Sequence, residues 1–129
     1  ELKGKTRRTI GDALGLTKIG VGLTELAPGA VSALRHWHAE EDEFVYIVSG
    51  ELTLVTNDGT QLLKAGMVAG FPAGKADGHR LENRGTVKGT YIEISNRAAK
   101  EHVRYPDSDL QLVREGGGRN WLHRDGKPY

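Results

Sequence analysis

The sequence predicts an all-β fold, an antiparallel sandwich or a closed barrel, on three observations. Apolar residues alternate with polar ones or form short bursts such as Phe44–Val48, which is typical of strands rather than amphipathic helices. Turn-forming residues interrupt these runs roughly every eight to twelve residues, as in sandwiches and barrels. Glycine is unusually frequent, at 18 of 129 residues, and many tight turns between short strands would explain that number.

The expected elements follow in chain order from these patterns. Strands are predicted over Gly20–Leu26, Ala30–His38, Glu43–Val48, Leu52–Thr56, Thr60–Lys64, Met67–Phe71, His79–Asn83, Gly89–Ser95 and His102–Tyr105. Pro28-Gly29 and Ser49-Gly50 provide turns, and Asn57-Asp58-Gly59 has the composition of a hairpin loop. Helices are predicted only over Arg7–Leu16 and Arg97–Glu101, and neither is long enough to cover a sheet.

The length predicts a single domain over residues 1–129. Residues 1–18 and 116–129 are expected to form arms outside the barrel, with Gly116-Gly117-Gly118 as a flexible hinge before the second arm. Whether that arm packs on a neighbouring subunit or frays stays open at this point.

Charge and cysteine content exclude several classes of protein. The formal net charge of +1 argues against nucleic acid as a partner, because nucleic-acid binders carry a clustered basic excess. No apolar run is long enough to span a membrane. The chain has no cysteine, so disulfides, thiolate metal sites and cysteine nucleophiles are impossible. A small domain without disulfides fits a cytoplasmic location.

Two histidines and a glutamate are the first candidates for chemistry. The period of two along a strand places His36 and His38 on one face of the predicted strand Ala30–His38. Glu43 opens the next strand after an acidic loop, and it approaches both imidazoles if the two strands pair. An H-x-H pair alone is more often the wet face of an edge strand than a metal site, so the wider pattern has to decide.

That wider pattern resembles the first motif of the cupin superfamily. Six residues separate Gly29 from His36, where the family more often has five. One residue, Trp37, separates His36 from His38. Four residues then lie between His38 and Glu43, and six lie between Glu43 and Gly50. Residues 29–50 therefore match the family's arrangement of Gly, H-x-H, Glu and Gly.

Residues 66–83 resemble the second cupin motif, with one departure. Gly66 is followed by five residues and by Pro72-Ala73-Gly74, as in the family. Four residues then precede His79, where the family usually has two, so that by strict counting Asp77 holds the histidine's place. We favour His79, because it alone keeps the three-residue spacing to Asn83.

The resemblance implies a cupin double-stranded β-helix, also called a jelly-roll barrel, with a metal site inside one end. It implies four protein ligands: His36, His38, Glu43 and His79. Three imidazoles and a carboxylate suit a divalent transition metal, namely Zn, Mn, Fe, Ni, Co or Cu, and the donor set does not choose among them.

The function implied is that of a small metal-dependent enzyme acting on a polar or anionic small molecule. Cupins with similar ligand sets include isomerases, dioxygenases and decarboxylases, so the reaction type stays open. The pattern looks most like stand-alone bacterial cupins described as sugar-phosphate isomerases. No separate nucleophile and base are visible, and the catalytic residues are therefore unknown. The alternatives are a non-catalytic cupin module that binds a small molecule, and a protein with a purely structural metal.

The strand Glu43–Val48 has two apolar faces. Val45 and Ile47 share the side of Glu43 and are expected to line the barrel below the metal. Three residues have the opposite parity and predict contact with a second layer or partner: Phe44, Tyr46 and Val48. We therefore expect a homodimer.

The remaining histidines and the cations near the second motif are predicted to lie at the surface. His102 and His123 are outside both motifs. Three cations gather around the second motif and could form a rim for an anionic substrate, although ordinary solvated loop charges are the more frequent case: Lys75, Arg80 and Arg84.

Overall fold

The computed structural model describes residues 2–129 and contains three antiparallel sheets. The five-stranded sheet has the order β1 (Lys5–Arg8), β2 (Ile19–Leu26), β9 (Gly89–Asn96), β4 (Glu43–Ser49) and β7 (Val68–Phe71). The three-stranded sheet has the order β6 (Gly59–Lys64), β5 (Glu51–Thr56) and β8 (Arg80–Glu82). The third sheet, which we call the C-terminal sheet, has the order β12 (Gly118–Leu122), β11 (Leu110–Glu115), β10 (Lys100–Tyr105) and β3 (Trp37–His38).

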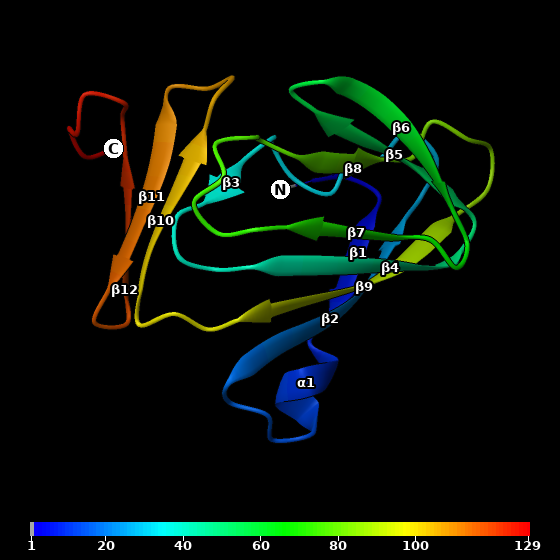
Figure 1. Cartoon of the computed structure of the whole chain (residues 1–129), viewed down its shortest axis with the longest axis horizontal. Helices are drawn as coiled ribbons and strands as arrows, with labels where there is room; N and C mark the ends of the chain where they lie inside the picture. The colour runs from blue at the N-terminus through cyan, green and yellow to red at the C-terminus, as the bar shows by residue number, and fades with distance from the viewer. Residues whose placement is uncertain (1) are drawn as a thin grey trace.

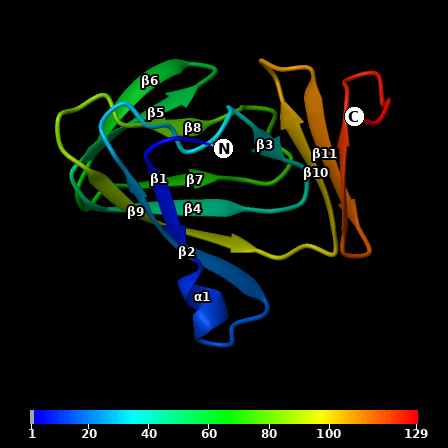
Figure 2. The same cartoon turned by 180° about the vertical axis from the view of Figure 1, so that it is seen from behind.

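The first two sheets face each other as the walls of a barrel, and the C-terminal sheet stands beside one end of it (Figure 1). Seen from behind, the same end of the barrel faces β10 and β3 (Figure 2). The single helix of the described residues, α1 (Ile10–Ala13), lies below β2 in both views. The all-β prediction and the jelly-roll barrel are confirmed. No helix among residues 2–129 has the length and apolarity that a membrane crossing would require.

The core lies between the two walls of the barrel. Val45 and Ile47 are 5% and 0% exposed, as their parity predicted, and they pack with buried leucines and with Tyr91. The walls approach closely at Gly89, where a Cβ atom would lie 2.6 Å from a methyl carbon of Leu52. Glycine at that position therefore lets a fully buried leucine side chain fill the space between the sheets.

Most predicted strands are present within one or two residues, but the segment Ala30–His38 is different. Only its last two residues form a strand, and the rest is a loop with isolated bridges from Val31 to Glu82 and from His36 to His79. In this loop the Arg35 guanidinium donates to the carboxylate of Asp107 and to the carbonyl of Gly78, both far away in the sequence. These contacts and the two isolated bridges stand in place of the regular ladder that the alternating pattern predicted.

Of the two helix predictions, Arg7–Leu16 is confirmed only at its centre, and Arg97–Glu101 is wrong. In place of a helix over Arg7–Leu16, β1 pairs with β2 through Arg8, and only the four residues of α1 are helical. Glycines at positions 11 and 15 explain the short helix, because glycine disfavours helical backbone. The segment Arg97–Glu101 contains no helix either, and its last two residues begin β10.

The expected hinge at Gly116-Gly117-Gly118 is a tight hairpin turn. Glu115 pairs with Gly118, so the two residues between them make the turn, with φ of 60° at Gly116 and 84° at Gly117. Two consecutive positive φ values define the type of two-residue turn that best joins antiparallel strands. The end segments predicted as arms therefore contain β1 and β12, which pair with strands of this same chain.

Candidate metal centre

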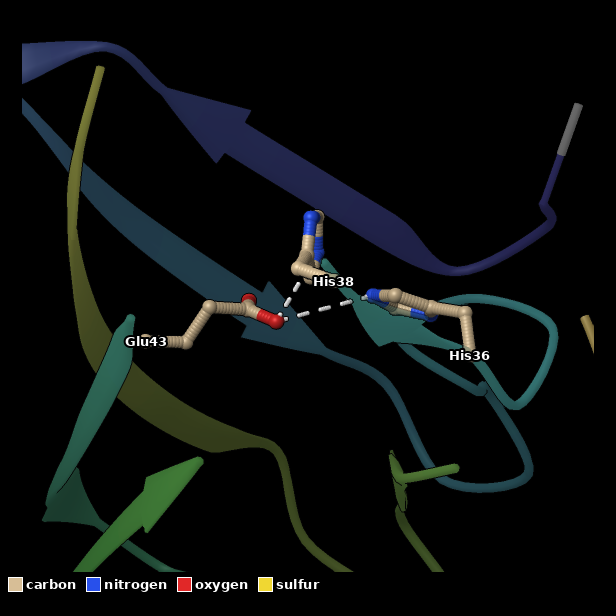
Figure 3. Close-up of side chains that lie close together, drawn as sticks. All are labelled: His36, His38 and Glu43. Atoms are coloured by element: carbon tan, nitrogen blue, oxygen red, sulfur yellow. Dashed lines mark ion pairs between the residues drawn. The ribbon is translucent and has the colours of Figure 1, made fainter. Parts of the chain in front are cut away.

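The histidines and the glutamate of the two motifs meet at the end of the barrel that faces the C-terminal sheet. His38 lies in β3, which pairs with β10, and Glu43 is the first residue of β4. The backbone N–H of His36 donates to the carbonyl of His79 at 3.2 Å, and that of His79 donates to His36 at 2.9 Å. The two H-x-H histidines are thus held by different partners, His36 by a bridge to His79 and His38 by β10, and both rings approach Glu43 (Figure 3).

Three imidazole nitrogens converge on one carboxylate oxygen. Oε1 of Glu43 lies 2.9 Å from Nε2 of His38, 2.9 Å from Nε2 of His79 and 3.8 Å from Nε2 of His36. Ligand atoms of His36, His38 and Glu43 all lie within 4.8 Å of one another. This is the density of nitrogen and oxygen donors that a first-row divalent metal requires.

The Nδ1 atoms of the three histidines have different surroundings. Nδ1 of His36 lies 2.8 Å from the carbonyl oxygen of Leu34, which accepts its hydrogen and leaves Nε2 without one. Nδ1 of His38 and Nδ1 of His79 are buried without a hydrogen-bond partner. The His79 ring is instead held by stacking on Phe71, with ring centroids 3.7 Å apart and an interplanar angle of 6°.

Burial and mutual charge shift the pKa values of the cluster in different directions. Burial lowers the pKa of His36 to about 4, although Glu43 opposes the change. Burial also acts to lower the pKa of His38, but the contact with Glu43 outweighs it and raises that pKa above its ordinary value. Burial acts to raise the pKa of Glu43, and the adjacent imidazoles of His38 and His79 hold it well below its usual range. Glu43 is therefore an anion at neutral pH, as a metal ligand must be.

The two candidates for the fourth ligand occupy different places. His79 is 6% exposed and its Nε2 is in the cluster. The Oδ1 atom of Asp77 accepts the backbone N–H of Asn57 at 2.8 Å, which ties the second motif to the β5–β6 hairpin loop. The geometry thus gives Asp77 a role in holding a loop and brings His79 to the other three side chains.

A cavity of about 870 Å³ opens onto the cluster. All four side chains line it, and its walls come from the five-stranded sheet on one side and the C-terminal sheet on the other, including Arg7, Glu93, Ser95, Arg114, Arg119 and Trp121. A second, smaller cavity of about 130 Å³ reaches His38, Glu43 and His79 from the direction of Phe71 and Lys75. The large cavity has room for a polar metabolite beside the cluster.

Of the three cations near the second motif, Lys75 lines the smaller cavity, and the other two are engaged elsewhere. Arg80 and Arg84 both pair with the carboxylate of Glu82, at 2.6 and 2.9 Å, so their charges are largely compensated. The two remaining histidines are partly exposed, and each contacts a polar side chain. His102 lies 2.6 Å from the amide oxygen of Gln111, and His123 contacts Asp109 at 2.7 Å.

Sequence reasoning missed the contribution of the C-terminal sheet. Glu101 of β10 is buried beside His38, and Tyr105 of the same strand stands 5.7 Å from the ring of His36. The three glycines after Leu110–Glu115 indicate a hairpin, but no local signal could have found these two contacts, because they depend on the pairing of β10 with β3.

Comparison with known proteins adds the family to this geometry. The cupin domain family matches residues 22–95, which run from within β2 to within β9 and include both motifs. The chain is a cupin. Among curated proteins, it is 30% identical over 108 residues to the tetracenomycin polyketide synthase protein TcmJ of Streptomyces glaucescens, over 82% of this chain and 70% of that protein.

Two solved cupin structures resemble the chain over almost its full length. One is a sugar phosphate isomerase of the cupin superfamily from Silicibacter pomeroyi, with a TM-score of 0.94 and 38% identity, covering 98% of this cupin and 80% of that chain. The other, from Acidithiobacillus ferrooxidans, is described as a candidate sugar phosphate isomerase and has a TM-score of 0.89 and 30% identity, covering 97% of this cupin and 80% of that chain. The polyketide cyclase RemF of Streptomyces resistomycificus, at 18% identity and a TM-score of 0.65, shares the fold.

Proposed function

We propose that this cupin binds a divalent transition metal through His36, His38, Glu43 and His79. The observation that carries the proposal is the convergence of three Nε2 atoms on one oxygen of Glu43 at the mouth of a large cavity. The donor set fits Mn, Fe, Co, Ni, Cu or Zn, and four protein ligands leave positions open on a five- or six-coordinate ion. When bound, the metal would supply Lewis-acid or redox chemistry at the cavity floor.

We further propose that the protein is an enzyme whose substrate is a small polar molecule carrying an anionic group, with sugar phosphates as the leading class. The likeness to the Silicibacter pomeroyi isomerase supports this class. So do two cations of the cavity wall, Lys5 and Arg119, neither of which has an ion pair within residues 2–129. Burial lowers the pKa of Lys5, and its ammonium group donates to the carbonyl of Ser32 at 2.5 Å. These two groups would bind and orient the anion, and isomerisation is the favoured reaction over dioxygenation or decarboxylation.

The fourth ligand is tested by comparing His79→Ala with Asp77→Ala. Loss of an imidazole from the cluster is expected to weaken metal binding at least tenfold, whereas loss of a loop-capping carboxylate should change it less than twofold. Metal content after dialysis, followed by titration of the metal-free protein with Zn²⁺ or Mn²⁺, measures both effects. The opposite ranking would assign the position to Asp77 and contradict the ligand set.

Catalysis is tested on the metal-loaded protein with a panel of aldose and ketose phosphates. Conversion that stops on chelation and returns with metal supports the enzyme. A sugar phosphate that binds saturably and is recovered unchanged supports the alternative, a non-catalytic binding module. A closed tetrahedral zinc site without exchangeable positions would instead indicate a structural metal.

We also propose that the protein is a homodimer, acting in the cytoplasm, that pairs through the outer face of its five-stranded sheet. Phe44, Tyr46 and Val48 are 40–43% exposed there, and Val68 of the neighbouring strand is 54% exposed. A stable interface needs about 800 Å² per partner, and an apolar sheet face is the surface type that obligate dimers bury. Tyr46→Lys should shift sedimentation at micromolar concentration toward the monomer, and a monomeric unsubstituted protein would contradict the proposal.

A further inference from the structure

Glu101 is a buried acid that lies outside the part of the chain matched by the cupin family. It belongs to β10, six residues beyond the match, and its side chain is 1% exposed. A carboxylate in such a place is costly unless its oxygens are hydrogen-bonded. One of them is satisfied: Oε1 accepts the backbone N–H of Glu40 at 2.9 Å and that of His102 at 2.8 Å.

The other oxygen of Glu101 is aimed at the metal centre. Oε2 is buried without a hydrogen-bond partner and lies 3.4 Å from Nδ1 of His38, which is also buried without a partner. The strand register brings the two together. Val103 pairs with His38 across β10 and β3, so Glu101, two residues earlier on the same face of β10, is the diagonal neighbour of the histidine.

Glu41 is the second acid near the His38 imidazole, and one of its oxygens already has two hydrogen-bond donors. Oε2 of Glu41 accepts hydrogen bonds from Arg114 at 2.7 Å and from the backbone N–H of Ala98 at 3.0 Å, and its Oε1 stands 3.9 Å from Nδ1 of His38. Of the two carboxylates, Glu101 is the one that is closer to the imidazole and has an oxygen without another partner.

We propose that Glu101 is a positioning residue of the metal centre: its Oε2 accepts the Nδ1 hydrogen of His38 and fixes the tautomer whose Nε2 is free to bind the metal. The inference rests on the proposed metal site. The carbonyl of Leu34 fixes the same tautomer of His36. A carboxylate oxygen and a backbone oxygen thus each accept the Nδ1 hydrogen of one H-x-H histidine. A carboxylate in this position also increases the basicity of the ligand, and loss of such a partner typically weakens metal affinity about 10- to 100-fold.

Glu101→Gln separates this role from a structural one. The amide oxygen of glutamine can still accept the two backbone N–H groups, so the fold should be kept. Its NH₂ group then faces Nδ1 of His38 and favours the other tautomer, with the hydrogen on Nε2. Glu41→Gln is the matched control, because it removes the same charge at a similar distance from the imidazole and leaves Glu101 in place.

Two measurements decide the inference. Long-range ¹H–¹⁵N NMR at about pH 8.5, well above the ordinary histidine pKa, reports the tautomer of His38. It is recorded on metal-free proteins that all carry Glu43→Ala, because the Glu43 carboxylate would otherwise accept a hydrogen from Nε2 of His38 at 2.9 Å. We expect hydrogen on Nδ1 with Glu43→Ala alone and with Glu41→Gln added, and on Nε2 with Glu101→Gln added. Titration with Zn²⁺ against a competing chelator should show a loss of at least tenfold in affinity for Glu101→Gln and less than threefold for Glu41→Gln.

The inference is overturned if Glu101→Gln keeps the hydrogen on Nδ1, or if its affinity for Zn²⁺ falls no further than that of Glu41→Gln. A protein that binds none of the first-row metals would instead overturn the proposed function. The NMR result would still decide whether Glu101 holds the tautomer, so the two failures are distinguishable.

Discussion

Strand β4 passes through two regions that are built in opposite ways. At Ile47 its side chain is fully buried among apolar neighbours, and at Glu43 it lies among three imidazoles. Five buried side-chain polar atoms in residues 2–129 lack a hydrogen-bond partner, and four of them belong to the centre: Nδ1 of His38, Oε1 of Glu43, Nδ1 of His79 and Oε2 of Glu101. Buried polar groups without a partner lower the free energy of unfolding. The apolar core therefore stabilises the barrel, whereas the metal-free centre destabilises it in exchange for a binding site.

The largest expected effect separates the two regions directly. Ile47→Ala removes a fully buried side chain and should lower the free energy of unfolding by about 2–5 kcal/mol, since it leaves a cavity between the sheets. His36→Ala in the metal-free protein should cost less than about 1.5 kcal/mol, because the imidazole lies mainly among the polar rings of His38 and His79 and is not part of the apolar core. Denaturant titration of both variants measures the difference, and equal losses would show that the centre is part of the stabilising core.

A bound metal should raise the free energy of unfolding that the metal-free centre lowers. Ligands brought together by folding bind the native state alone, so free metal at 100 times its dissociation constant adds about 2.7 kcal/mol and several degrees to the melting temperature. Thermal melts with metal and with chelator test this. His36→Ala should abolish the shift, and His123→Ala, which lies outside the cluster, should leave it unchanged. Identical melts for protein shown to be metal-loaded would contradict the coupling.

The size of that shift should fall as the pH is lowered. Metal binds neutral imidazole, and the raised pKa of His38 means that this histidine takes up a proton at a higher pH than an ordinary imidazole does. The proton on His38 also favours the metal-free folded protein, because a raised pKa contributes stability below the unfolded value that is lost as the pH rises. Both effects reduce the metal-dependent shift between about pH 8 and pH 6. A shift that grows on acidification would exclude His38 as a ligand.

The two regions also differ in how far the sequence predicts them. Alternation places Val45 and Ile47 in the core, and the structure agrees, because the period of two applies to any regular strand. The same rule wrongly predicts a regular strand over residues 30–36. There the segment forms only isolated bridges, with His36 bridged to His79, whereas His38 pairs with β10 as part of β3.

The C-terminal sheet was beyond the reach of local patterns for a different reason. Its strand β10 pairs with β3, which lies more than sixty residues earlier in the chain, and the sequence of Lys100–Tyr105 does not indicate that partner. The contact of Glu101 with His38 depends on that pairing, so only the structure could bring this acid to the motif histidine. The motif spacing found His36, His38 and Glu43, because a short loop joins them.

The alternation along β4 makes this strand intolerant of register errors. Glu43 faces the centre, Val45 and Ile47 face the core, and Phe44 and Tyr46 face outward. A slip of one residue would turn the carboxylate outward and put the two aromatic rings in the barrel at the same time. A misregistered chain would therefore lose its core and its centre together, and no well-packed but inactive form could accumulate. Natural insertions should be rare within residues 43–47 and should collect beyond the bulge that the pairing with β9 shows between Ile47 and Ser49.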